Sequence, residues 1–449
     1  TFEAESRPAD SVQRGPARRV LWIAIDGADW SRMEALFASG RLPHLKRLRD
    51  EGATAPLETL FPTWSPRIWT SLATGRAPES HGVLDFVEYR ARGGACGVQR
   101  LRRQNRLPAG LGLHRVVEAL IAAGQLSQMP VTSCQRRVPS LWNIASSAGV
   151  RSTTVGWYAS WPTDPVNGYI VSDLNPIRAA FRDLGFRFRD EVGNEAREAA
   201  ARTGLTAPPS LLGELVANVE IPNIPDDPEA ILALPFFEEL TEEQRARESE
   251  RSLLQVFRSI YQSDVFSVGS TEYLFRRDPG DLVSVYFSGV DNTSHRFTQP
   301  GVVDRYYDVA DEFVGRLVAA AGPDVTTLIV SDHGWAYADL VDERFGHGHA
   351  PDGIFILHGP EIPALRLKAK PHVYDVAPTL LALLGLPADE RMEGRAVLEA
   401  LPEAARAESR RPRVDYGSYA YTPAASVAPD EVLQDEMMHR LKALGYVDE

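Results

Sequence analysis

Two continuous apolar runs in the second half of the chain predict buried β-strands. They cover residues 282–287 and 325–330, and a third run of the same kind covers residues 19–25. Runs rich in Val, Ile and Leu, without alternation of polar and apolar residues, are typical of parallel strands whose two faces are both covered by helices. The pattern therefore predicts an α/β protein built on a mostly parallel sheet.

Polar residues that bind metals well follow each of these runs. Asp26 follows the run at 19–25, Asp291 and His295 follow the run at 282–287, and Asp332 and His333 follow the run at 325–330. Ligands of parallel α/β sheets gather beyond the carboxyl ends of the strands. We therefore expect these side chains to meet in a metal centre, although a single Asp-His pair after a strand is more often turn chemistry.

A short helix is predicted over residues 65–75. Ser is a favoured N-cap, Pro66 is favoured at the first helical position, and Gly75 is a favoured end. The Ser65 hydroxyl would then lie at the positive end of the helix dipole, beside free backbone N–H groups, where an alkoxide or a phosphate is stabilised. Ser65 is the candidate nucleophile, and its alternative role is that of a plain N-cap.

The composition narrows the class of protein. With 44% hydrophobic residues the chain has ample material for a core, and its net charge of −13 argues against binding to a nucleic-acid duplex. We find no apolar run long enough to span a membrane. The polar start, without Met, leaves room for a removed signal, so a periplasmic or secreted location is favoured over a cytoplasmic one. Cys96 and Cys134 could form one disulfide or remain thiols.

The order of the patterns predicts one large catalytic domain that carries an insertion. Long charged helices, including a capping box at 241–244, lie between the strand runs and predict a helical cap. A locally basic stretch, residues 84–137, is expected to be a solvated or interdomain charged surface, and the alternative is that it faces the substrate. We divide the chain into an N-terminal linker (1–18), a first catalytic segment (19–174), the helical cap (175–279), a second catalytic segment (280–400), and a C-terminal tail with a helix (401–449).

The candidate residues favour two-metal phosphate chemistry. Carboxylates with imidazoles suit zinc, and also manganese or iron. Three converging carboxylates repel one another unless cations are present, and two divalent ions would leave the site attractive to an anion. A small phosphate ester is the expected substrate. A Ser-His-Asp hydrolase is a poorer account, because Ser65 lacks the Gly-x-Ser-x-Gly elbow.

An ordered set of motifs resembles a known family. Residues 25–27 (Ile-Asp-Gly), 62–65 (Pro-Thr-Trp-Ser), 79–82 (Glu-Ser-His-Gly) and 332–334 (Asp-His-Gly), together with Asp291, His295 and His349, look like the alkaline phosphatase superfamily. Within it they are most similar to the type I phosphodiesterase/nucleotide pyrophosphatase branch. The resemblance implies a three-layer α/β/α sandwich with two zinc ions. It further implies one ion surrounded by Asp26, Ser65, Asp332 and His333, and another held by Asp291, His295 and His349.

The resemblance has one departure and leaves choices open. Ile68 stands where nucleotide pyrophosphatases usually carry an Asn that contacts phosphate, and Arg67 could supply the missing contact. His349 is preferred over His347 because its spacing to Gly353 fits the family. The expected activity is phosphoric-ester hydrolysis through a phospho-Ser65 intermediate. The alternatives are a phosphotransferase or mutase, or an inactive metal-binding protein, and a homo-oligomer stays open.

Overall fold

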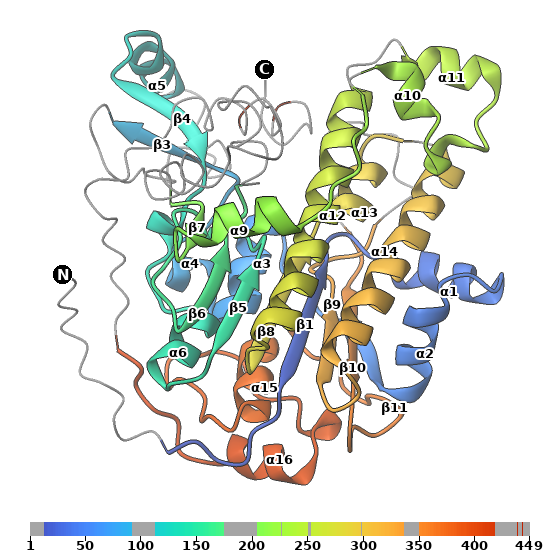
Figure 1. Cartoon of the computed structure of the whole chain (residues 1–449). Helices are drawn as coiled ribbons and strands as arrows, with labels where there is room; N and C mark the ends of the chain where they lie inside the picture. The colour runs from blue at the N-terminus through green and yellow to red at the C-terminus, as the bar shows by residue number, and fades with distance from the viewer. Residues whose placement is uncertain are drawn as a thin grey trace.

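A nine-stranded sheet forms the centre of the protein, in the order β11-β2-β10-β9-β1-β8-β5-β6-β7 (Figure 1). The computed structural model describes residues 13–91, 113–174, 204–225, 227–249, 253–297, 299–335, 350–417, 438 and 442. The central strand, β1 (Val20–Ile25), runs parallel to β8 (Leu282–Phe287) on one side and to β9 (Thr326–Val330) on the other. The three predicted strands are confirmed to within one residue.

Most of the remaining strands also run parallel to a neighbour. Parallel pairs join β5 (Ser152–Val155) to β8, β6 (Gly168–Val171) to β5, and β11 (Leu365–Arg366) to β2 (Ala53–Leu57). The exceptions are β10 (Gly353–His358), antiparallel to β2 and β9, and β7 (Thr206–Ala207), antiparallel to β6. A separate antiparallel pair consists of β3 (Val87–Ala91) and β4 (Leu126–Pro130).

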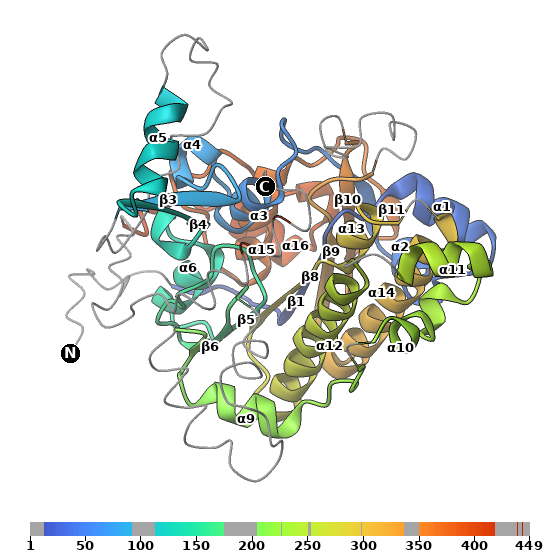
Figure 2. The same cartoon turned by 90° about the horizontal axis from the view of Figure 1, so that it is seen from above.

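Helices cover both faces of the sheet and form the two outer layers (Figure 2). One core packs against α1 (Trp30–Ala38), α2 (Pro43–Glu51), α12 (Leu253–Arg277) and α14 (Pro300–Ala321). The other packs against α3 (Ser65–Thr74), α6 (Leu141–Ser147) and α15 (Val376–Leu383). Alternate side chains of β1 enter opposite cores, Ile23 one and Trp22 the other. The predicted three-layer α/β/α sandwich is confirmed.

Seven further helices are described. They are α4 (Pro78–His81), α5 (Leu113–Ala122), α9 (Leu211–Asn218), α10 (Pro228–Leu232), α11 (Glu242–Ser249), α13 (Gly289–Ser294) and α16 (Glu403–Ser409). Short 3₁₀ turns include η3 (Pro235–Phe237) and η4 (Val373–Asp375). Among the described residues, no helix is both long enough and apolar enough to cross a bilayer.

The segment predicted as a cap, residues 175–279, has several structural roles. Its described portion includes β7, which extends the sheet, and α12, which covers a sheet face, while α10 and α11 project at the upper right of Figure 1. The capping box is confirmed, because Thr241 N–H donates to Gln244 Oε1 (2.9 Å) and Gln244 N–H donates to Thr241 Oγ1 (3.2 Å). The domain boundaries stay a prediction.

Two other expectations fall partly outside the described residues. Of the predicted C-terminal helix, only residues 438 and 442 are described, and both are helical. Cys134 is disulfide-bonded, and Cys96, the only other cysteine in the chain, lies outside the described residues.

Arg136, expected on a charged surface, is buried instead, so this detail of the prediction is wrong. Its side chain is 1% exposed and pairs with Asp164, which also accepts hydrogen bonds from Trp142 Nε1 (3.0 Å) and Asn143 Nδ2 (3.2 Å). Arg136 also donates to the carbonyl oxygen of Ala159 (3.0 Å), a residue held at a positive φ of 53°. A basic run in sequence does not reveal such burial, because the carboxylate that offsets its cost lies on another loop.

We predict that Arg136→Met destabilises the protein by about 3–5 kcal/mol, because it leaves the Asp164 carboxylate buried without its cation. The measurement is urea unfolding at neutral pH. The control is Arg366→Met, which removes one member of an exposed pair with Glu34 and should change stability little. Equal midpoints for the two variants would contradict the prediction.

Candidate metal centre

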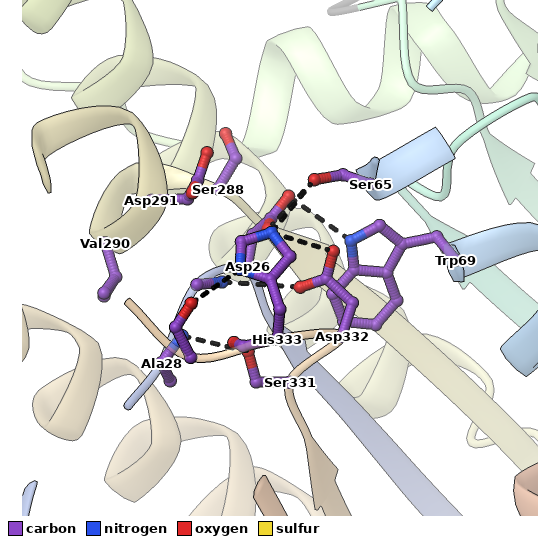
Figure 3. A network of polar contacts seen from close by, with 12 residues as sticks. Asp26, Ala28, Ser65, Trp69, Ser288, Val290, Asp291, Ser331, Asp332 and His333 are labelled. Carbon is purple, nitrogen blue, oxygen red and sulfur yellow. Dashed lines mark hydrogen bonds and ion pairs between the residues drawn. The ribbon is translucent and has the colours of Figure 1, made fainter. Parts of the chain in front are cut away.

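The carboxyl ends of three neighbouring strands meet at one edge of the sheet. Ile25 at the end of β1 pairs with Phe287 at the end of β8, and Ala24 pairs with Val330 at the end of β9. This register places the residues that follow the strands side by side. Asp26, Asp332 and His333 lie directly after β1 and β9, and Asp291 comes from α13 after β8 (Figure 3). The predicted meeting of these side chains is observed.

The helix α3 brings Ser65 to this edge. Ser65 Oγ lies 3.4 Å from Asp26 Oδ1 and 3.4 Å from His333 Nε2, and its side chain is buried (Figure 3). The helix starts one residue earlier than predicted, with Trp64 as its N-cap and Ser65 as its first residue. The Ser65 hydroxyl makes no hydrogen bond to the backbone of α3. It is turned toward the Asp26 carboxylate and the His333 imidazole instead.

The first turn of α3 offers fewer free donors than the sequence predicted. Pro66 has no N–H, and the N–H groups of Arg67 and Ile68 both donate to the Trp64 carbonyl oxygen, at 3.1 and 3.2 Å. The expectation of free backbone N–H groups beside Ser65 is therefore not met at Pro66, Arg67 or Ile68. Stabilisation of an anion at this point depends more on side chains and cations than on the helix backbone.

One carboxylate oxygen of Asp26 accepts hydrogen bonds from the protein, and the other faces the candidate metal centre. Its Oδ2 accepts hydrogen bonds from Tyr286 OH (2.5 Å) and Trp69 Nε1 (3.3 Å). Its Oδ1 faces Ser65 Oγ and lies 3.6 Å from His333 Nε2. Because two neutral donors occupy Oδ2, Asp26 is oriented to offer Oδ1 to an ion.

One contact of His333 shows which of its ring nitrogens carries a proton. Its Nδ1 lies 2.9 Å from the carbonyl oxygen of Gly334, which can only accept, so Nδ1 carries the proton. Nε2, the other ring nitrogen, points toward Asp26, Ser65 and Asp332, whose Oδ2 is 3.4 Å away. A metal-binding histidine requires this arrangement, in which one nitrogen donates to the protein and the other is available.

The loop that carries these two residues is held at both sides. Ser331 Oγ accepts from Ala28 N–H (2.9 Å) and donates to the His333 carbonyl oxygen (2.7 Å) (Figure 3). Thr59 Oγ1 donates to the Asp332 carbonyl oxygen at 2.5 Å. The loop is thus tied to the residues after β1, which places Asp332 and His333 relative to Asp26.

The third carboxylate, Asp291, completes a group that could hold a metal. Asp26, Asp291 and His333 each offer one ligand atom, and these atoms lie within 4.8 Å of one another. His295, at the end of α13, places Nε2 at 3.5 Å from Asp291 Oδ2 and packs its ring edge-on against Trp335. His349 and its alternative His347 lie outside the described residues.

The pKa values of the site show how costly its charges are without a cation. Burial, aided by the negative charge of Asp332, raises the pKa of Asp26 well above its ordinary value. Burial also raises the pKa of Asp332 to about 7, and it lowers the pKa of His295 well below its ordinary value. The carboxylates are therefore unstable as anions here, and the imidazole is in its neutral, metal-binding form.

Arg67 lies in the first turn of α3, two residues after Ser65. Its guanidinium is half-buried, and its Nε is buried with no hydrogen-bond partner among the described residues. Burial lowers the pKa of Arg67, and the charges of Glu79, Tyr374 and Asp85 only partly oppose that effect. No carboxylate in the described portion of the chain forms an ion pair with it. The predicted phosphate contact is compatible with this position.

Two residues that orient Asp26 were not predicted. Trp69 stands four residues after Ser65, which places both on the same face of α3, so helical spacing could have identified it. Tyr286 lies inside a strand that is buried throughout. A uniformly apolar strand gives no signal that one of its side chains turns a hydroxyl toward the site.

Comparison with known proteins identifies the family of this chain. The family model for type I phosphodiesterase/nucleotide pyrophosphatase matches residues 20–371. A Synechococcus 2,3-bisphosphoglycerate-independent phosphoglycerate mutase is 32% identical over 130 residues, which cover 26% of this chain and 24% of the mutase. The chain thus matches only about a quarter of the length of such curated relatives.

Solved structures share the fold at low sequence identity. Wild-type alkaline phosphatase PafA aligns with a TM-score of 0.51 and 11% identity, over 86% of this chain and all of that one. Murine ectonucleotide pyrophosphatase/phosphodiesterase 5 aligns with a TM-score of 0.43 and 13% identity, over 82% of this chain and 95% of that one. The match to PafA shows that the sheet is that of the alkaline phosphatase-like fold. With most of its length matched by the family model, the chain belongs to the type I phosphodiesterase/nucleotide pyrophosphatase family.

Proposed function

We propose that the enzyme hydrolyses a small phosphate ester with two divalent metal ions and a covalent phospho-Ser65 intermediate. The observation that carries this proposal is the place of Ser65 Oγ, 3.4 Å from both Asp26 Oδ1 and His333 Nε2. A hydroxyl buried between a carboxylate and an imidazole with an available lone pair is well placed to act as a nucleophile once cations neutralise the carboxylates.

The residues present fit divalent ions. Carboxylate, hydroxyl and imidazole donors suit zinc, with manganese or iron as alternatives. The tautomer of His333 and the clustering of three buried ligand atoms support the same conclusion. In our proposal one ion is held by Asp26, Ser65, Asp332 and His333, and the other by Asp291, His295 and His349. When bound, such ions supply Lewis acidity to the ester and favour the ionised hydroxyl.

Ser65 carries the covalent step. Its Oγ forms a bond to phosphorus while the bond from phosphorus to the leaving oxygen breaks, and the leaving oxygen departs with the bonding electrons. The Ser65 proton passes to solvent. A water oxygen then attacks the same phosphorus, the bond from phosphorus to Oγ breaks, and Ser65 recovers a proton, so that one water is consumed per ester cleaved.

Arg67 and the helical segment would set how the substrate is held. Arg67 lacks an ion pair among the described residues and stands in the turn that starts with Ser65, which supports a contact with a phosphoryl oxygen. Phe237 of η3 packs edge-on against Phe297, two residues after His295. This contact ties part of the predicted cap, segment 175–279, to the chain just after His295. On this basis we propose that the cap helps to select the substrate.

Phosphate transfer is the second candidate function. The observation that favours it is the match of about a quarter of the chain to phosphoglycerate mutases. Both functions share the phospho-Ser65 step and differ in the acceptor. Release of the product in plain buffer indicates hydrolysis, whereas a requirement for an added alcohol acceptor indicates transfer.

We expect Ser65→Ala to reduce hydrolysis of aryl phosphate esters by more than about 10³-fold, because the nucleophile is lost, while two metal ions are retained, because Asp26, Asp332 and His333 remain to hold the ion beside it. Turnover and metal content are measured on the same samples. The control is Ser71→Ala. This variant removes another hydroxyl of α3, which lies 2.9 Å from His81 Nε2. Near-normal turnover in the Ser65 variant would refute the nucleophile role.

We expect Arg67→Met to lower kcat/KM for phosphate esters by about 10²-fold with little change in melting temperature, because Arg67 has no ion pair to lose among the described residues. Arg67→Lys should recover some of the loss. The control, Arg76→Met, removes a guanidinium just beyond the other end of α3, near Asp389. Steady-state kinetics decide, and unchanged kinetics in Arg67→Met would exclude the contact.

Metal binding should depend on pH through the buried carboxyl groups. Asp332 has a pKa of about 7 in the folded chain and about 3.9 when unfolded. Between these values the folded state binds more protons, so without metal the free energy of unfolding falls as pH rises from about 4 to about 7. Metal affinity rises over the same range, because the metal binds the carboxylate. Melting curves with chelator or zinc measure both, and a melting temperature in chelator that rises over this range would contradict the prediction.

A further inference from the structure

A buried carboxylate outside the candidate ligand set lies behind the helix that carries two of the ligands. Asp264, on α12, is 2% exposed. It accepts hydrogen bonds from the N–H groups of Ser288 (3.1 Å) and Gly289 (2.8 Å) and from Tyr306 OH (2.9 Å). One side chain thus joins α12 to the start of α13 and to α14.

The helix α13 depends on this outside support. It has 6 residues, and its N-cap, Ser288, makes no side-chain capping bond. A helix this short is not stable by itself, since nucleation is unfavourable and its first N–H groups lack partners. Asp264 supplies an acceptor for two N–H groups at the start of α13 and places a carboxylate at the positive end of the helix dipole.

Close packing fixes the same end of α13 sterically. A Cβ at Gly289 would lie 1.9 Å from the Tyr306 ring, and Tyr306 is fully buried on α14. The helix therefore lies directly on α14, and it also contacts α12 (Figures 1 and 2). The contact between Gly289 and Tyr306 leaves no free space, so a shift of α13 caused by losing the hydrogen bonds of Asp264 would have to move Tyr306 as well.

Backbone hydrogen bonds connect the start of α13 to the candidate ligands Asp291 and His295. Asn292 N–H donates to the Ser288 carbonyl oxygen (3.0 Å), and His295 N–H donates to the Asp291 carbonyl oxygen (3.0 Å). These bonds continue one short helix from the residues that Asp264 holds to Asp291 and His295. The direction of α13 therefore sets where both side chains meet an ion.

We propose that Asp264 is a positioning residue for the metal held by Asp291 and His295, and that it acts by anchoring the start of α13. This inference rests on the proposed two-metal function. The hydrogen bonds of Asp264 reach the backbone at the start of α13, so its effect on the two ligands passes through the helix backbone. Support of metal ligands by residues behind them changes metal affinity by about 10–100-fold.

The test compares two matched variants by calorimetric titration of the metal-free protein with zinc, and by the visible spectrum of the cobalt-loaded protein. Asp264→Asn should weaken one of two binding events by about 10–100-fold and leave the other within about twofold. The control is Asp311→Asn. Asp311 is also a buried carboxylate that caps another helix, accepting from His44 (3.2 Å) and Leu45 (2.6 Å) N–H at the start of α2, which carries no candidate ligand.

Both binding events should keep their wild-type affinity in Asp311→Asn, even if its melting temperature falls as far as that of Asp264→Asn. Two unchanged events in Asp264→Asn would overturn the inference and leave the proposed function standing. A wild-type protein that binds no metal would overturn the proposed function itself. If Asp264→Asn does not fold, Tyr306→Phe decides, since it removes one donor from Asp264: a selective loss at one event supports the inference, and wild-type affinities refute it.

Discussion

Mutual repulsion among buried carboxylates is the constraint on which the rest of the site depends. Asp26, Asp291 and Asp332 lie at the ends of adjacent strands, each almost completely buried. Burial and neighbouring negative charge raise the pKa of Asp26 and Asp332, so their ionised forms are costly unless a cation lies beside them. The neutral donors around Asp26, the tautomer of His333 and the anchored loop after β9 are all consistent with a site arranged for cations.

Much of the fold could be predicted because burial on both faces leaves a plain pattern. Residues 282–287 and 325–330 are apolar almost throughout and form β8 and β9, and the capping box at Thr241 forms as its sequence implies. The direction of β10 could not be predicted, since an antiparallel strand inside the sheet is as apolar as a parallel one. The burial of Arg136 was missed because its partner, Asp164, is distant in sequence.

The candidate site could be predicted in its side chains but not in its support. Asp26, Ser65 and His333 stand directly at strand and helix ends, where position alone indicates their meeting. The residues that orient these side chains do not stand at strand or helix ends, so their positions in the sequence do not identify them. Tyr286 lies within a strand, and Asp264 lies in the middle of a long helix, so their roles depend on which elements become neighbours in three dimensions. Packing of distant segments is not encoded in local periodicity.

The place of β1 in the sheet has a consequence for biosynthesis. Val20 pairs with Leu282 on one side and Thr326 on the other. Both pairing partners of this apolar strand are therefore synthesised much later than the strand itself. An unpaired apolar strand invites association with other chains. In the nascent protein both edges of β1 therefore stay unpaired until the segments of β8 and β9 have been synthesised.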